Sequence, residues 1–289
     1  MKIFAKGWSN DYDGPGRRFV YYLKGCNFNC LWCGSPESIS AEAEMLFYPA
    51  KSSCTELCCD KGAVKNGRLQ RAQCSQCLDR PCINIWHNPA FEFVGEELTP
   101  KEIIRALEER RPLWGNDGGV TFSGGEPSLQ LTELIEVATA LKKQGIHLTI
   151  ETNASTGDFN KIREFFDLII CDLKCITPQL HREMTGTDNR NVLSNITAAA
   201  NANQAMIVRI PLISELNFTL EEQAAFLQFF RKVKPAKVEL LRLHKLATPK
   251  YIAMNKMSPF EQLHSPKKSA VNKFITELKK IGIKVQLVN

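Results

Sequence analysis

Apolar runs and amphipathic segments alternate along most of the chain, in a repeated strand-then-helix order. Runs rich in Val, Ile, Leu and Phe predict strands, and recurrence of apolar residues at the 3.6-residue period predicts helices. The predicted strands cover residues 17–24, 118–125, 146–153, 167–174, 205–212, 236–244 and 282–289. The predicted helices cover residues 99–111, 129–144, a short segment from Asp158, 190–203, 219–233 and 266–281.

These elements make six strand–helix units and a terminal strand. Such alternation implies an α/β fold with a parallel sheet and right-handed crossovers. Six units are fewer than the eight of a closed barrel, so an open, partial (β/α)6 TIM-like barrel is expected, with a doubly wound sheet as the alternative. In either architecture the active residues gather at the C-terminal ends of the strands.

Residues 49–97 interrupt the alternation, because they are rich in Cys and show little periodicity. The expected organisation therefore has three parts. Residues 1–48 hold the first barrel strand and a cysteine loop, 49–97 form a small Cys-rich insertion, and 98–289 complete the barrel.

Composition narrows the class of protein. Apolar residues make up 44% and charged residues 24% of the 289 residues, which is typical of a globular protein. The net charge of +6 is mild and no Lys/Arg run concentrates it, so no nucleic-acid partner is expected. No stretch of about 18 apolar residues predicts a membrane span, and the first residues lack the apolar core of a signal peptide. We therefore expect a cytoplasmic protein.

Eleven cysteines are many for this length, and six of them fall between Cys54 and Cys82. Without a secretion signal, clustered cysteines favour metal binding or catalysis over disulfides.

Three further cysteines, Cys26, Cys30 and Cys33, lie within eight residues directly after the first predicted strand. Soft thiolates at such spacing suit an iron–sulfur cluster or zinc. Zinc usually takes four ligands in two pairs, and no fourth Cys or His lies nearby, so a cluster is favoured. In a four-iron cluster, three thiolates leave one iron open to another ligand. Leu31 and Trp32 would give the ligands an apolar cover.

Two other polar groups stand at predicted strand ends. The turn from Gly124 to Pro127 links a strand to a helix, and its glycines allow backbone to approach a ligand closely, although a plain tight turn would use the same residues. Asp172 and Lys174 share one face of a strand, whereas Cys171, Leu173 and Cys175 face the other way. Charged groups in a barrel mouth need partners, so this Asp and Lys either pair with each other or bind a ligand.

With these motifs the chain resembles the radical S-adenosylmethionine (SAM) superfamily, whose hallmark is Cys-x3-Cys-x-aromatic-Cys, here with Trp32 as the aromatic residue. Residues 13–18 resemble the Asp-Gly-Pro-Gly-x-Arg stretch of the glycyl radical enzyme activases of the pyruvate formate-lyase activase type. LKGCNFNCLWC, Pro36-Glu37-Ser38 and GGVTFSGGEPSLQ also resemble these activases, so the likeness covers nearly the whole chain.

The resemblance implies a mechanism and its partners. A 4Fe-4S cluster on Cys26, Cys30 and Cys33 would bind SAM at its open iron. Reductive cleavage of SAM would give a 5′-deoxyadenosyl radical, which abstracts hydrogen from one glycine of a partner enzyme. The expected partners are therefore a glycyl radical enzyme and a flavodoxin or ferredoxin-type electron donor.

The resemblance also assigns the SAM site. Gly124, Gly125 and Glu126 would bind the SAM amino group, Lys174 its carboxylate, and Asp172 either SAM or a nearby monovalent cation. The full cofactor-binding set so implied is Trp32, Gly34, Gly124, Gly125, Glu126, Glu151, Asp172, Leu173, Lys174, Arg209 and His244. His181, in the stretch HREMTG, belongs to a similar family motif but receives no chemical role.

Many activases carry a two-cluster ferredoxin-like module at the insertion, built from two four-cysteine motifs that exchange their fourth ligands. Here the module is degenerate, since Trp86 stands where a fourth cysteine of the second motif would fall. One set is complete by the exchange rule and predicts a single auxiliary 4Fe-4S cluster, with Cys58 as a substitute ligand and zinc at the same thiolates as the alternative. That set is Cys59, Cys74, Cys77 and Cys82.

Two other functions stay open at this stage. A radical SAM enzyme acting on a small molecule would share the cysteine triplet and the glycine turn, but not the Asp-Gly-Pro-Gly-x-Arg stretch together with the insertion. A non-catalytic iron–sulfur or zinc-binding protein would explain the insertion, but not the triplet at a strand end.

Overall fold

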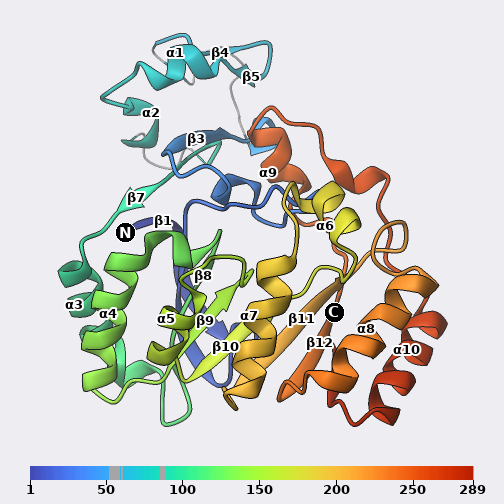
Figure 1. Ribbon diagram of the computed structural model, residues 1–289. Helices are drawn as coiled ribbons and strands as arrows, with labels where there is room; N and C mark the ends of the chain where they lie inside the picture. The colour runs from blue at the N-terminus through green and yellow to red at the C-terminus, as the bar shows by residue number, and fades with distance from the viewer. Residues whose placement is uncertain (52–58, 60, 85–88, 289) are drawn as a thin grey trace.

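The computed structural model describes residues 1–51, 59, 61–84 and 89–288 (Figure 1). Its centre is a nine-stranded sheet in the order β13-β12-β11-β10-β9-β8-β2-β1-β7. Neighbouring strands from β2 to β13 are all parallel. These strands are β2 (Arg17–Leu23), β8 (Gly119–Gly124), β9 (Leu148–Thr152), β10 (Leu168–Asp172), β11 (Met206–Leu212), β12 (Lys237–Arg242) and β13 (Val285–Val288).

The long helices lie along one face of this sheet (Figure 1). A doubly wound sheet carries helices on both faces, so the open, partial barrel is the architecture that forms. The sheet does not close, since its order runs from β13 to β7 without a return pairing among the described strands. The helices are α3 (Pro100–Arg110), α4 (Leu131–Lys143), α5 (Phe159–Ile162), α7 (Arg190–Asn201), α8 (Leu220–Lys232) and α10 (Lys268–Lys280).

Apolar stripes hold the helices against the sheet. In α3, Ile103 and Leu107 are fully buried, and in α4 Leu134 and Leu141 are fully buried in the same core. A capping box begins α3: the Thr99 hydroxyl accepts from the Glu102 N–H, and the Glu102 carboxylate accepts from the Thr99 N–H. Such a cap stabilises a helix by about 1 kcal/mol.

Several elements escaped the sequence pattern. β1 (Lys2–Asn10) pairs antiparallel with β2 and extends the sheet, with the short β7 (Glu96–Glu97) outside it. α6 (Pro178–Thr185) and α9 (Thr248–Ala253) stand where polar loops are expected. The two helices are too short for a clear helical period. β1 is half exposed along most of its length, which weakens its apolar signal.

The Cys-rich segment forms a small unit at one end of the barrel, beside α9 (Figure 1). At its base β3 (Glu44–Phe47) pairs antiparallel with β6 (Phe91–Val94), and β4 (Val64–Lys65) pairs with β5 (Arg68–Leu69). Two short helices complete it, α1 (Arg71–Ser75) and α2 (Pro81–Asn84). The unit buries its own apolar cluster, separate from the barrel core.

None of the described helices combines the length and the apolar composition that a membrane crossing requires.

Candidate functional site

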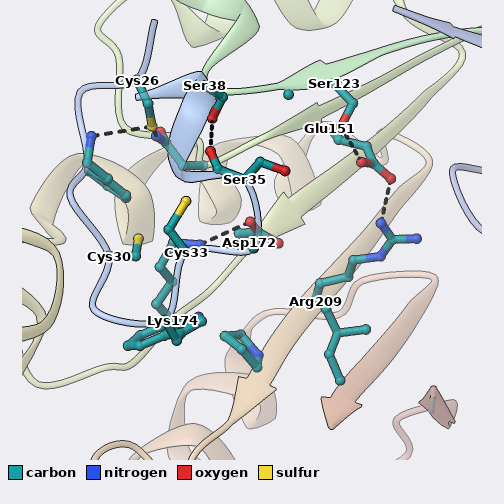
Figure 2. A pocket seen from close by; sticks show the side chains of 18 of the residues that line it. Cys26, Cys30, Cys33, Ser35, Ser38, Ser123, Glu151, Asp172, Lys174 and Arg209 are labelled. Atoms are coloured by element: carbon teal, nitrogen blue, oxygen red, sulfur yellow. Dashed lines mark hydrogen bonds and ion pairs between the residues drawn. The ribbon is translucent and has the colours of Figure 1, made fainter. Parts of the chain in front are cut away.

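A cavity of about 320 Å³ opens where the parallel strands end, between the cysteine loop and the ends of β8 to β12. Figure 2 shows the three thiols on one side of it and the pair of Glu151 and Arg209 on the other. Most of the residues predicted for the site line this cavity together. They are Cys26, Cys30, Trp32, Cys33, Gly34, Gly124, Gly125, Glu151, Asp172, Lys174, Arg209 and His244.

Two predicted residues do not line it. Leu173 is fully buried in the main core, as expected from strand alternation. Glu126 is also fully buried. Its carboxylate accepts hydrogen bonds from the Ser128 N–H and hydroxyl, the Thr152 hydroxyl (2.8 Å) and the Asn153 N–H (2.7 Å). Burial raises the pKa of Glu126, and these hydrogen bonds oppose the rise. Glu126 therefore ties the turn after β8 to the end of β9.

The cysteine loop follows β2 and is fixed at both ends. At its start the Gly25 N–H donates to the Ser38 carbonyl (2.8 Å), and at its end the Tyr251 hydroxyl donates to the Cys33 carbonyl (3.2 Å). The Phe28 N–H points at the Cys26 sulfur (3.4 Å). Hydrogen bonds to sulfur are one of the factors that set a cluster's potential.

Burial raises the pKa of the Cys26 thiol to about 11 and that of the Cys33 thiol to about 12, and it also raises the pKa of Cys30. The thiols are therefore protonated at neutral pH until a metal displaces their protons. Trp32 covers the loop, since it is buried beside Cys175 and Met184. Leu31 is 44% exposed, so of the two residues predicted as an apolar cover only Trp32 is buried.

The glycines of the turn after β8 admit no side chain. Gly124 has φ +116°, and a Cβ there would lie 2.3 Å from the Leu23 nitrogen. A Cβ on Gly125 would lie 2.2 Å from the Gly25 carbonyl oxygen. The chain thus brings bare backbone to the wall of the cavity, directly beside the cysteine loop.

Asp172 and Lys174 share one face, as predicted, and the Lys174 ammonium lies 3.0 Å from the Asp172 carboxylate. Lys174 is 7% exposed. Burial opposes its charge, but the Asp172 carboxylate outweighs that effect and holds the pKa of Lys174 above its ordinary value. Cys171 and Cys175 are fully buried among apolar side chains, away from the face of Asp172 and Lys174.

Across the cavity, Arg209 forms ion pairs with Glu151 and with Glu239, and its guanidinium also donates to the Tyr12 carbonyl. The Ser123 hydroxyl donates to Glu151 (2.5 Å). Burial raises the pKa of Glu151 to about 7, although Arg209 pulls it down. Any further cation in the cavity would stabilise the ionised form of the Glu151 carboxylate.

The stretch at residues 13–18 is held in place by Arg18, which is fully buried. Its guanidinium donates to the Thr121 hydroxyl (2.7 Å) and to the carbonyls of Val120 (2.7 Å) and Pro15 (3.2 Å). Gly16 has φ +71°, and a Cβ there would lie 2.4 Å from the Asp117 carbonyl oxygen. This turn is thereby pinned to β8, with Tyr12 at the cavity.

Two lining residues, Tyr12 and Ser123, were not found from the sequence, whereas Asn153 lines the cavity next to the predicted Glu151. Asn153 joins the β9 end to the cysteine loop, since its amide donates to the Asn27 side chain (2.9 Å). Its place directly after a parallel strand was the available signal.

In the insertion, the four cysteines of the predicted complete set line one small cavity together: Cys59, Cys74, Cys77 and Cys82. Cys54, Cys58 and Trp86 lie outside the described residues. Within the described ranges, no three His, Cys, Asp or Glu side chains meet closely enough to hold a single metal ion. Thiolates that bind different irons of one cluster lie farther apart than the ligands of one ion.

Ion pairs and a hydrogen bond join the insertion to parts of the chain near the cysteine loop. Arg71, three residues before Cys74, pairs with Glu44 (3.0 Å), which also lies 3.5 Å from the buried Lys24. The Asn255 amide, just beyond α9, donates to the Leu69 carbonyl (2.7 Å). Arg71 also donates to the Ala253 carbonyl of α9 (3.4 Å), and Tyr251 of α9 donates to the Cys33 carbonyl, so α9 contacts both the insertion and the cysteine loop.

A family model described as the radical SAM superfamily matches residues 20–227. The 4-hydroxyphenylacetate decarboxylase activating enzyme of Clostridioides difficile (strain CD196) is 33% identical over 263 residues, covering 85% of this chain and 82% of that protein. The choline trimethylamine-lyase activating enzyme of Oleidesulfovibrio alaskensis is 30% identical over 269 residues, covering 87% and 86%.

Among solved structures, a domain of the pyruvate-formate lyase-activating enzyme from Bacteroides vulgatus is similar, with a TM-score of 0.50 and 24% identity. It covers 60% of this chain and 99% of that domain, and at this identity it supports the fold alone.

Proposed function

Since the chain belongs to the radical SAM superfamily and is an activating enzyme of glycyl radical enzymes, we propose that its cavity holds SAM against a 4Fe-4S cluster on Cys26, Cys30 and Cys33. The observation that carries this proposal is the meeting, around one cavity, of the three thiols, the bare glycine backbone and the Asp172–Lys174 pair. These groups come from strands far apart in the sequence, and the fold brings them to one cavity at the C-terminal ends of those strands.

The residues that line the cavity fit both the 4Fe-4S cluster and SAM. The loop offers three soft thiols and no fourth protein ligand, and the backbone N–H of Phe28 already points at one sulfur. When bound, the cluster supplies one electron that cleaves SAM reductively, and the radical so formed takes hydrogen from a glycine of the partner enzyme. The chain's own residues bind SAM, orient it and keep water out.

Each charged group of the cavity has a part in this proposal. Lys174 would hold the SAM carboxylate, because it is a buried ammonium already aimed at an anion. Gly124 and Gly125 would let the SAM amino group approach backbone. Asp172, whose side chain is 39% exposed, would face SAM or a monovalent cation, and His244 would contact SAM.

The proposal is tested by anaerobic reconstitution with iron and sulfide, followed by reduction in the presence of SAM. Equal amounts of 5′-deoxyadenosine and methionine are expected. A reconstituted protein that holds the cluster but forms neither product would contradict the enzyme function.

SAM binding should strengthen as pH rises through about 7. Burial raises the pKa of Glu151 to about 7, so this carboxylate is neutral below that pH and negative above it. SAM carries a sulfonium and an ammonium, and a positive ligand favours the ionised carboxylate. We expect the Kd of SAM to fall about fivefold between pH 6 and pH 8.

Glu151→Gln is the matched variant for this pH dependence, since it keeps the shape of the side chain and removes the carboxyl group that titrates. Its Kd for SAM should stay flat over the same range, as measured by equilibrium binding to the reconstituted protein. An equally steep pH profile in Glu151→Gln would assign the titration to another group.

The auxiliary site is part of the same proposal. Cys59, Cys74, Cys77 and Cys82 would hold one 4Fe-4S cluster, so the wild-type protein should contain about eight irons per chain and Cys77→Ala about four. Cys77→Ala should keep the spectrum of the triplet cluster, because the two cysteine sets line separate cavities. About four irons and one zinc per wild-type chain would mean that these four thiolates hold zinc and no second cluster.

We also propose a flavodoxin or ferredoxin-type electron donor, and the cytoplasm as the compartment. The described cysteines are all free thiols, as a reducing compartment allows. The partner is a glycyl radical enzyme, which must present its glycine at the open mouth of the barrel.

A further inference from the structure

The motif HREMTG, residues 181–186, lies against the middle of the cysteine loop. α6 ends at Gly186, whose φ of +83° turns the chain back. Two backbone N–H groups of the cysteine loop donate to carbonyls of the last turn of α6: Asn29 to Thr185 (2.8 Å) and Leu31 to Met184 (3.0 Å). The last carbonyls of a helix have no partner within the helix, so the loop satisfies acceptors that the helix leaves open.

His181 lies at the centre of this contact and is fully buried. Its Nδ1 lies 2.5 Å from the Thr187 carbonyl oxygen, so Nδ1 carries the proton and donates it. Its Nε2 is buried with no hydrogen-bond partner in the described part of the chain. The imidazole packs edge-on against Phe28, with the ring centroids 5.2 Å apart and the planes at 74°. Phe28 stands midway between Cys26 and Cys30.

A buried histidine that leaves one nitrogen unsatisfied costs free energy, because an unpaired polar atom forfeits its hydration. A Leu or Met would fill the same space without that cost. The imidazole makes one contact that an apolar residue cannot: its Nδ1–H donates to the Thr187 carbonyl and holds the chain after Gly186, while its ring packs against Phe28.

The other side of α6 is anchored at the end of β10. The Glu222 carboxylate accepts from the Ile176 and Thr177 N–H groups, both at 2.8 Å. The Asn189 amide donates to the carbonyls of Cys175 (3.0 Å) and Ile176 (2.7 Å). These bonds begin one residue after Lys174. The helix thus spans from the Lys174 side of the cavity to the cysteine loop.

We propose that residues 181–187 form a cradle that sets the position of the Cys26–Cys33 loop relative to Lys174, with His181 as its central positioning residue. The cradle acts on the loop through Phe28, through the N–H groups of Asn29 and Leu31, and through the Thr187 hydroxyl, which donates to the Asn27 carbonyl (3.4 Å). Its Met184 also packs in one cluster with Trp32. The consequence for SAM cleavage rests on the proposed function, whereas the ordering of the loop does not.

The test compares wild type, His181→Ala and His181→Asn as reconstituted holoprotein, with His264→Ala as control. Asn can place an N–H donor near the position of Nδ1, and His264 pairs with Glu215 on the surface. The first measurement is amide hydrogen exchange in peptides that cover residues 27–31. The second is the EPR spectrum of the reduced cluster with and without SAM, together with kcat and KM for SAM cleavage.

His181→Ala should exchange about tenfold faster at residues 27–31 and broaden the EPR spectrum, with the iron content kept. Its kcat should fall about tenfold while the KM for SAM changes less than threefold, as for other residues that support metal ligands from behind. His181→Asn should recover most of both losses, and His264→Ala should match wild type. If His181→Ala does not fold, Phe28→Leu, which touches the cradle from the loop side, replaces it with the same expectation.

Unchanged exchange at residues 27–31 in His181→Ala or Phe28→Leu would overturn the cradle, as would His181→Asn impaired as fully as His181→Ala. The proposed function is tested separately. If the wild-type holoprotein cleaves no SAM while the variants show the predicted differences in exchange, the cradle stands and the radical chemistry is rejected.

Discussion

Cys30→Ala is expected to abolish reductive SAM cleavage, with at least about a thousandfold loss of 5′-deoxyadenosine formation. Cys30 is the middle thiol of the triplet and lines the cavity with Cys26 and Cys33. Two remaining thiolates cannot hold a four-iron cluster that needs three, so the iron that binds SAM is lost with it. The product is measured chromatographically after reduction of the reconstituted variant.

Cys171→Ala is the matched control, because Cys171 is fully buried in the apolar core and takes no part in the cavity. It should keep the iron content and the rate of cleavage, and lose only about 1 kcal/mol of the free energy of unfolding. Turnover retained in Cys30→Ala, or lost in Cys171→Ala alone, would refute the assignment of the catalytic cysteines.

Lys174→Met is expected to weaken SAM binding by about 10- to 100-fold. The Lys174 ammonium is 7% exposed, and a hydrogen bond to a charged group contributes about 1.5–3 kcal/mol. Met keeps the length of the side chain, but it leaves the SAM carboxylate, and Asp172 at 3.0 Å, without their cation. The Kd of SAM is measured by equilibrium binding to the reconstituted protein.

Lys245→Met removes the same charge from an exposed position next to His244 and should change the Kd less than twofold. Equal losses in the two variants would mean that the net charge of the mouth matters and that no specific contact exists. An unchanged Kd in Lys174→Met would place the SAM carboxylate elsewhere.

The strand–helix alternation was enough to predict the parallel strands, since β2 to β13 fall within the predicted ranges. Buried parallel strands are continuous apolar runs, and this signal needs no knowledge of the fold. β1 was missed because its side chains are half exposed, and α6 and α9 because helices of six to eight residues are too short to show a period.

Site residues were predicted from the sequence where the function requires a particular residue type. They were missed where only the fold brings a common residue type to the cavity. Clustered cysteines, paired glycines and an Asp and a Lys at a strand end are chemically unusual, so the sequence reveals them. Tyr12 and Ser123 are ordinary residue types that the fold carries to the cavity. Glu126 shows the converse, because a charged residue in a functional motif turns inward and ties two strand ends together.

His181 illustrates why a motif can be visible in a sequence without its role. Its partners are the Thr187 carbonyl and the Phe28 ring, and the second of these lies more than 150 positions away along the chain. Only the packing of α6 on the cysteine loop brings them together.

The central claim, that this chain generates a radical on a glycine of another protein, is tested most directly by EPR spectroscopy of that partner. The reduced, reconstituted enzyme is mixed with SAM and a glycyl radical enzyme encoded in the same genome. A glycyl radical doublet should form on the partner, and it should be absent with Cys30→Ala or without SAM. Cleavage of SAM with no radical on any such partner would contradict the activase function and favour a small-molecule substrate.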